Sequence, residues 1–203
     1  MARSPFEAIE TQISGKANDE IPRSELVFIN DTVRDKEQIL DGLLKSDEQG
    51  PLFDVFILDG AEDGIYQVNS ILEEYENLEA IHFVTHGSDG QISLGSNWIN
   101  NATIEEYSDP MSSWGNALSE NGDILFYGCN IAAGVDGRIL LENISDLTGA
   151  AVAASDDITG NANLGGDWDL ELNLGEIDTR VAFSAVNQHD WNHSLADPVI
   201  TLP

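Results

Sequence analysis

The sequence predicts an α/β protein, namely a three-layer sandwich with a mostly parallel central sheet, helices on both faces and a C-terminal β extension. From Glu25 onward, short apolar runs alternate with segments of helical periodicity, an order that is typical of a parallel sheet. Turn residues separate these runs. After residue 160 the periodicity changes to a strict alternation of apolar and polar residues, which predicts a strand with one wet face.

The first elements follow from apolar runs and from helical spacing, although Gly42 weakens the first helix. A run of helical spacing opened by Pro110 and closed by Gly122 predicts a later helix. The expected strands span residues 25–31, 53–60, 78–87, 123–130 and 150–157. The expected helices span residues 33–46, 63–78, 110–122 and 135–149.

Two further β features complete the expected fold. Residues 90–99 predict a small hairpin with a turn at Gly95 and Ser96. Residues 163–175 place Trp168, Leu170 and their apolar neighbours at every second position, which predicts the C-terminal β extension.

The chain is expected to form one domain. With 203 residues, 41% of them apolar, it is long enough for one sizeable core. Residues 1–24 are polar and interrupted by Pro5, Gly15 and Pro22, which predicts a flexible leader. We therefore expect a single domain over residues 25–195 and a loose tail over residues 196–203.

Targeting signals are the next feature of the sequence. No stretch approaches the roughly 18 consecutive apolar residues of a membrane span, and the first residues lack the apolar centre of a classical signal peptide. We expect no membrane insertion. The protein is then either cytoplasmic or exported by a signal that lies elsewhere on a longer polypeptide.

The charge balance is strongly acidic. The chain has 37 Asp and Glu against 8 Lys and Arg, a formal net charge of −29. This charge repels nucleic acid and anionic membranes, so we expect neither as a partner. An acidic surface most often serves solubility, and the binding of divalent cations is the functional alternative.

His86 and Cys129 follow two of the predicted strands. Both residues stand where an apolar run stops at small residues, and the carboxyl ends of parallel strands meet at the same edge of a sheet. If the two strands are neighbours about 4.8 Å apart, the side chains can face each other across a cleft. The small residues around Gly128 and the amides near Gly87 then provide N–H groups for an oxyanion hole. An inert buried thiol is the simpler reading of the only cysteine.

The motifs "IHFVTHG" and "ILFYGCN" resemble those of the caspase-like cysteine peptidase superfamily. More closely, the chain from about Glu25 to Leu195 resembles a bacterial family of unknown function that is found near the amino ends of very large secreted repeat proteins and adhesins. This resemblance is carried by "HFVTHGSDGQISLG", "GDILFYGCNIAAG", "LTGAAVAASDDITG" and "GGDWDLE".

The resemblance implies a catalytic dyad and a cellular setting. It implies His86 as general base or imidazolium partner and Cys129 as nucleophile, with the amides of Gly87 and Cys129 as oxyanion donors. It also implies a bacterial protein, secreted or on the cell surface as part of a larger polypeptide. The substrate is then a polypeptide, either the same chain or a neighbouring protein. The acidic surroundings oppose formation of the Cys129 thiolate unless His86 is charged beside it.

Asp156 and Asp157 are the candidate substrate-pocket residues. They follow the strand after Cys129, near the same sheet edge. An acidic pocket there favours Arg or Lys before the scissile bond, because a buried carboxylate without a cationic partner is costly. Arg23 is the most accessible internal target on that hypothesis. The alternative is that the two carboxylates only cap the turn after the strand.

Two metal sites are possible on sequence grounds. Asp167, Asp169 and Glu171 lie on one face of the predicted last strand and offer calcium ligands, although a wet strand face explains them equally well. A zinc site has less support, because no recognised ligand spacing is present. Its ligands would be His82, His86, Cys129 and either His189 or His193. We expect no required cofactor, with calcium as the one candidate.

Together these features predict a caspase-like cysteine endopeptidase that uses His86 and Cys129, for processing its own or a neighbouring polypeptide. The rival is a module of the same fold without catalytic activity, which anchors or binds partners in an adhesin and is stabilised by calcium. A third class is calcium-dependent adhesion.

Overall fold

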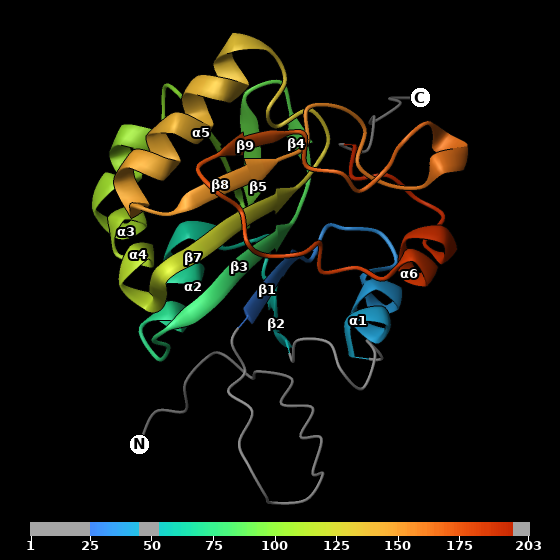
Figure 1. Ribbon diagram of the computed structural model, residues 1–203, viewed down its shortest axis with the longest axis horizontal. Helices are drawn as coiled ribbons and strands as arrows, with labels where there is room; N and C mark the ends of the chain where they lie inside the picture. Colours follow the sequence, from blue (N-terminus) through green and yellow to red (C-terminus); the bar gives the residue numbers. More distant parts are fainter. Residues whose placement is uncertain (1–24, 45–52, 197–203) are drawn as a thin grey trace, which may run out of the picture.

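A computed structural model describes residues 25–44 and 53–196 (Figure 1). The predicted leader, residues 1–24, and residues 197–203 of the predicted tail lie outside the described residues. The central sheet has six strands in the order β2-β1-β3-β7-β8-β9; all neighbours are parallel except β8 and β9. The strands are β1 (Glu25–Asn30), β2 (Phe53–Leu58), β3 (Leu78–Val84), β7 (Leu118–Tyr127), β8 (Ala151–Ala154) and β9 (Leu172–Leu174).

Helices cover both faces of this sheet, which confirms the predicted three-layer α/β sandwich (Figure 1). A separate antiparallel sheet, β4-β5-β6, forms the expected hairpin excursion. Its strands are β4 (Gly87–Ser88), β5 (Gln91–Leu94) and β6 (Asn97–Asn100). The helices are α1 (Lys36–Leu44), α2 (Gly64–Leu72), η1 (Ile104–Tyr107), α3 (Ser108–Ser112), α4 (Trp114–Ala117), α5 (Gly134–Thr148), η2 (Ala162–Leu164) and α6 (Ala185–Asp190).

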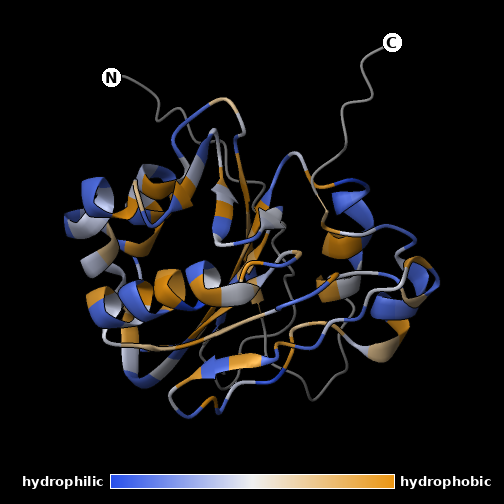
Figure 2. Cartoon of the chain, turned by 90° about the horizontal axis from the view of Figure 1, so that it is seen from above, coloured by the Kyte–Doolittle hydropathy of each residue, from blue (hydrophilic) through white to orange (hydrophobic). Residues whose placement is uncertain are grey.

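The central strands are buried on both faces because successive side chains point to opposite layers. In β1, Leu26 and Phe28 belong to one apolar cluster, whereas Val27 and Ile29 belong to the other. Seen from above, the apolar strands lie between the helical layers (Figure 2). The near-continuous apolar runs of the sequence are therefore the signature of a doubly covered sheet.

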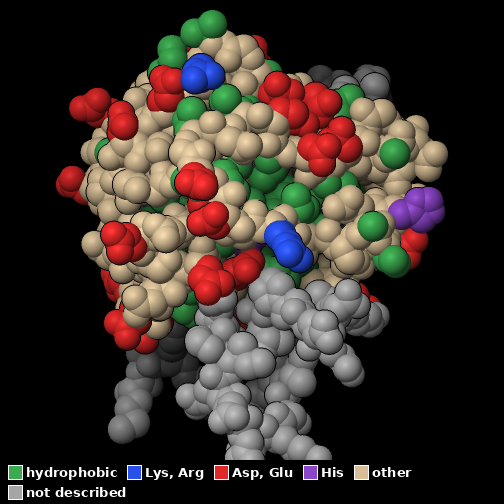
Figure 3. Space-filling model, viewed as in Figure 1, with side chains coloured by type: hydrophobic (Ala, Val, Ile, Leu, Met, Phe, Trp, Pro, Cys, Tyr) green, Lys and Arg blue, Asp and Glu red, His purple; other side chains and the backbone are tan. Residues whose placement is uncertain are grey.

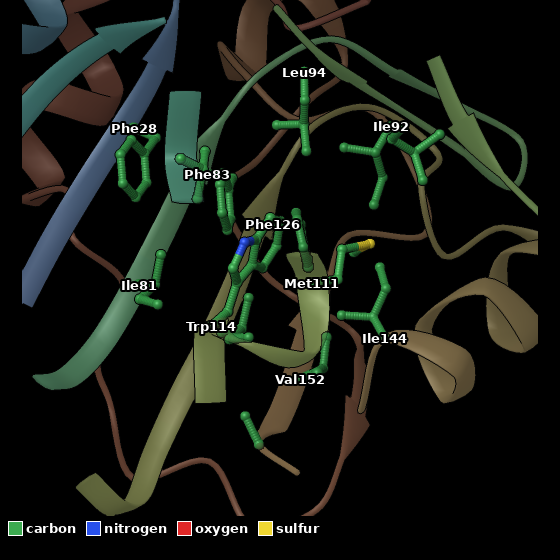
Figure 4. Close-up of a cluster of buried hydrophobic side chains, with 14 of the residues drawn as sticks. Phe28, Ile81, Phe83, Ile92, Leu94, Met111, Trp114, Phe126, Ile144 and Val152 are labelled. Carbon is green, nitrogen blue, oxygen red and sulfur yellow. The ribbon is translucent and has the colours of Figure 1, made fainter. Parts of the chain in front are cut away.

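The larger cluster lies between the sheet and helices α2 to α5 (Figure 4). Phe83 of β3 is its aromatic centre. This ring stacks on Phe28 at 5.4 Å, on Phe126 at 4.9 Å and on Trp114 of α4 at 5.3 Å between centroids. Such offset aromatic pairs contribute roughly 0.5–1.5 kcal/mol beyond the area that they bury.

The second cluster lies on the opposite face, under α1 and the C-terminal residues on either side of α6. It contains Cys129 together with Trp168, Phe183, Trp191 and Leu195. The candidate thiol therefore stands on this face of the sheet, as residues 125, 127 and 129 alternate away from the larger cluster.

Several sequence-based boundaries are wrong. The helix expected over residues 63–78 ends at Leu72, and the strands expected over residues 78–87, 123–130 and 150–157 end three residues early, at Val84, Tyr127 and Ala154. The helix expected over residues 110–122 ends at Ala117, and Leu118 already belongs to β7, where it pairs with Leu78. The strand expected within residues 163–175 is reduced to Leu172–Leu174. The alternation is nevertheless present as burial, since Trp168 is buried and its neighbours Asp167 and Asp169 are exposed.

Among the described residues, no helix has both the length and the apolar composition to cross a lipid bilayer.

Candidate functional site

His86 and Cys129 follow the ends of neighbouring parallel strands. In the register of β3 and β7, Val84 stands opposite Tyr127, and the N–H of Thr85 donates to the Tyr127 carbonyl at 3.0 Å. His86 and Cys129 each lie two residues beyond that last pair. The expected juxtaposition of the two strand ends is therefore present, whereas the catalytic roles of the two residues stay a prediction.

Glycine is required beside both residues because the chains approach closely. A Cβ on Gly87 would lie 2.4 Å from Cγ1 of Ile131 and 2.7 Å from the Cys129 carbonyl oxygen. A Cβ on Gly128 would lie 2.7 Å from Cδ1 of the same isoleucine. The predicted oxyanion residue Gly87 thus packs directly against the Cys129 main chain.

The His86 imidazole is buried and faces two main-chain carbonyl groups. Its Nδ1 lies 3.1 Å from the oxygen of Leu195, and its Nε2 lies 3.2 Å from the oxygen of Thr32. The His86 carbonyl accepts from the N–H of Ser93 at 3.0 Å. The histidine is therefore held at both its ring and its backbone.

The Cys129 thiol is also buried and is protonated at neutral pH. Its Sγ donates to the carbonyl oxygen of Thr159 at 3.6 Å. Burial is the main cause that raises the pKa of Cys129 to about 11; hydrogen bonds to the backbone of Thr159 and Leu195 offset only part of the rise, and the negative charge of Asp157 adds to it. A thiol in this state is a poor nucleophile.

Leu195 contacts both candidate residues and was not predicted as part of the site. Its N–H donates at 2.9 Å to the Thr159 carbonyl, the same oxygen that accepts from Cys129. Its own carbonyl faces His86. The sequence offers only a lone leucine among polar residues as a signal for this contact.

A polar relay crosses the same face of the sheet. The N–H of Ala182 donates to the Tyr127 hydroxyl at 3.1 Å, which leaves that hydroxyl to donate to Nδ1 of His82 at 3.2 Å. The other imidazole nitrogen of His82 then carries hydrogen and donates to Glu25 at 2.8 Å. When His82 is assigned this neutral tautomer, every hydrogen-bonding group of the relay has a partner. Burial raises the pKa of Tyr127 above its ordinary value, so the hydroxyl stays protonated. His82 is a core residue, as expected.

The predicted pocket and calcium residues lie on one exposed acidic patch. Ligand atoms of Asp156, Asp157 and Glu171 lie within 4.8 Å of one another. Asp167 and Asp169 are close enough to act electrostatically on Asp157. Figure 3 shows acidic side chains gathered on this face of the molecule. The structure thus joins Glu171 to the two residues that the sequence assigned to a substrate pocket.

Burial and like charge perturb this acidic patch. Partial burial is the main cause that raises the pKa of Asp157, and the charges of Asp167 and Asp156 add to it. Burial likewise raises the pKa of Glu171, although the N–H of Asp156 donates to it at 2.9 Å. The patch therefore carries unfavourable charge repulsion at neutral pH.

The zinc ligand set is not assembled. Within residues 25–44 and 53–196, a three-ligand group forms only at Asp156, Asp157 and Glu171. His82 is bound to Glu25, and Nε2 of His193 lies 2.6 Å from Asp35.

The architecture and this sheet edge define a three-layer α/β protein with an acid–base residue and a thiol at adjacent strand ends. The chain belongs to the family described as a domain of unknown function, DUF4347, whose profile matches residues 26–195. We found no significant match among curated proteins or among solved structures.

Proposed function

We propose that this domain is a caspase-like cysteine endopeptidase, with Cys129 as nucleophile and His86 as general base. The observation that carries the proposal is the position of these two residues, each two residues beyond the paired ends of β3 and β7. Open α/β sheets collect their reacting groups at this edge.

The proposed reaction is hydrolysis of a peptide bond. His86 takes the thiol proton of Cys129, and the sulfur attacks the substrate carbonyl carbon. The N–H groups of Gly87 and Cys129 stabilise the oxyanion. His86 then gives the proton to the leaving amine, and water hydrolyses the thioester to release the acid and restore the thiol. No metal or organic cofactor takes part in these steps.

In this proposal, the structure represents a resting state in which His86 and Cys129 are not accessible to a substrate. The pKa of Cys129, about 11, and the carbonyl contacts of both His86 nitrogens keep the pair from reacting as it stands. Opening requires Leu195 to leave, because its carbonyl holds one of those nitrogens.

The proposed setting is the maturation of a large bacterial polypeptide that is secreted or displayed on the cell surface. The substrate is the domain's own chain or a neighbouring protein. The net charge of −29 supports a polypeptide rather than nucleic acid as partner.

Intact-mass analysis tests the proposal. Wild type, Cys129→Ala and His86→Ala are incubated with and without a peptide library varied at the residue before the scissile bond. New fragments that form in wild type and in neither variant support the peptidase. Equal fragment patterns in all three proteins would refute it.

A second candidate is a module of the same fold without catalytic activity, which anchors or binds partners in an adhesin. The burial of the thiol and its raised pKa favour this candidate. It predicts normal function of the parent protein after Cys129→Ala, whereas the peptidase predicts a failure of processing.

A further inference from the structure

We propose that the space between residues 159–161 and residues 86–87, called here the groove, is a binding site for an extended polypeptide strand that buries a leucine-like side chain. Residues 193–196 of the chain itself, called here the 193–196 segment, occupy it. The site is distinct from the acidic patch, and it does not depend on turnover at Cys129.

The 193–196 segment lies in the groove as a strand does. On one side, the N–H of Asn161 donates to the His193 carbonyl at 2.9 Å, and Ser194 forms an antiparallel bridge with Gly160. On the other side, Ala196 forms a parallel bridge with Gly87. Main-chain pairing of this kind gives affinity without selecting a sequence.

Gly160 makes the close approach of the two chains possible. Its φ is +145°, and a Cβ built on it would lie 2.5 Å from the His193 carbonyl oxygen and 2.6 Å from Cα of Ser194. The 193–196 segment can therefore pass this close to Gly160 only because glycine has no side chain.

Leu195 supplies the selectivity. Its side chain is fully buried in the cluster that contains Cys129, Trp168 and Trp191. An apolar subsite lined in this way admits an aliphatic side chain, and a charged one would lose its hydration there without a partner. The flanking residues 194 and 196 are part-exposed or exposed. The groove therefore selects only the side chain at the position of Leu195.

The subsite lies next to the candidate dyad. Both the N–H and the carbonyl of Leu195 are held, by Thr159 and His86 respectively. A strand that replaces the 193–196 segment therefore presents the main chain of its own leucine-like residue to His86. This chemistry differs from the basic preference expected from Asp156 and Asp157, and the two are separable by experiment.

The test measures alkylation of Cys129 in the folded full chain by iodoacetamide. We expect Leu195→Ala to label at least about tenfold faster than wild type, a factor that corresponds to about 1.4 kcal/mol. Leu195→Met should stay protected, because it keeps the apolar volume. Circular dichroism confirms that each variant is folded.

A glycine pair provides a second, independent displacement of the segment. Gly160→Ala forces its Cβ into the segment and should also speed labelling. Gly165→Ala is the matched control, since this glycine also has a positive φ, +83°, but a Cβ there meets nothing within 4 Å. If folded Leu195→Ala and Gly160→Ala both label at the wild-type rate, the groove is refuted.

Peptides added in trans identify the ligand class. A capped peptide with the sequence of residues 192–197, NHSLAD, should protect Cys129 of Leu195→Ala, whereas NHSRAD should not. Equal protection by the arginine peptide would overturn the apolar subsite. Mass spectrometry of the same peptides reports turnover separately: protection without cleavage supports the groove and shows that NHSLAD is not a substrate, whereas the library experiment decides whether the domain is a peptidase.

Discussion

Nδ1 of His86 lies 3.1 Å from the carbonyl oxygen of Leu195, 109 residues further along the chain. The other ring nitrogen faces the carbonyl oxygen of Thr32. Since a carbonyl oxygen only accepts, both contacts are hydrogen bonds only when the imidazole carries two N–H groups. One ring thus joins the segment after β1, the end of β3 and the C-terminal residues.

Replacing this ring should destabilise the fold. His86→Ala removes the ring that contacts the carbonyl groups of Thr32 and Leu195, so at least one of these carbonyl groups loses its donor. We expect a loss of about 1–3 kcal/mol in the free energy of unfolding. Urea denaturation measures it. His189→Ala is the control, because that histidine is exposed. Equal midpoints for the two variants would show that the carbonyl contacts contribute nothing.

The Cys129 thiol should make stability fall at alkaline pH. Its pKa is raised to about 11 in the folded chain, whereas the pKa of a thiol in an unfolded chain is about 8.5. The stabilising contribution is complete below the unfolded pKa and is lost as pH rises through the folded one. Urea midpoints of wild type and Cys129→Ala, compared from pH 7 to 11, should show a shallower decline in the variant. Parallel declines would contradict the assignment.

Tyr127→Phe should be costly although it removes one oxygen atom. The change leaves the N–H of Ala182 and Nδ1 of His82 without partners in a buried site. We expect a loss of about 1–3 kcal/mol in the free energy of unfolding. The control is Tyr66→Phe, since Tyr66 is 58% exposed. Similar denaturation midpoints for both variants would rule out a stabilising relay.

Calcium should stabilise the acidic patch. Because the pKa values of Asp157 and Glu171 are raised, their contribution to stability is present below the unfolded carboxyl pKa and lost as pH rises through the folded one. A cation relieves this repulsion at neutral pH. At free calcium about tenfold above Kd we expect about 1.4 kcal/mol of stabilisation. Scanning calorimetry in calcium and in chelator measures it.

Two variants localise that calcium effect. Glu171→Gln should reduce the calcium-induced shift in Tm, whereas Asp89→Asn, an exposed carboxylate outside the patch, should not. If the Tm of wild type is the same in calcium and in chelator, the prediction that calcium binds is wrong. Equal shifts in both variants would place the ion elsewhere.

Most of the sheet could be predicted because each strand has a recognisable pattern of apolar residues within a short stretch of sequence. The runs that became β1, β3 and the second half of β7 are mostly apolar, as expected for strands covered on both faces. Parallel strands share one edge, so His86 and Cys129 could be placed together without coordinates. The helix over residues 110–122 failed because pairing of Leu118 with Leu78 overrides local helical spacing.

The rest of the site could not be predicted because its contacts leave no local signal. Leu195 is bound through main-chain groups, which every residue type possesses. Glu171 joins Asp156 and Asp157 because β9 pairs antiparallel with β8. Spacing within the sequence suggested instead a group with Asp167 and Asp169.

The long-range contacts of the C-terminal residues have a consequence for the order of folding during synthesis. Nε1 of Trp191 donates to the carbonyl of Arg34 at 3.1 Å, across 157 residues, and His193 pairs with Asp35 across 158. A ribosome that makes the chain from its N-terminus must finish the whole parallel sheet before these contacts can form. Until residue 195 emerges, the sheet edge that carries His86 and Cys129 is uncovered. In the finished domain the same edge is covered by the C-terminal residues.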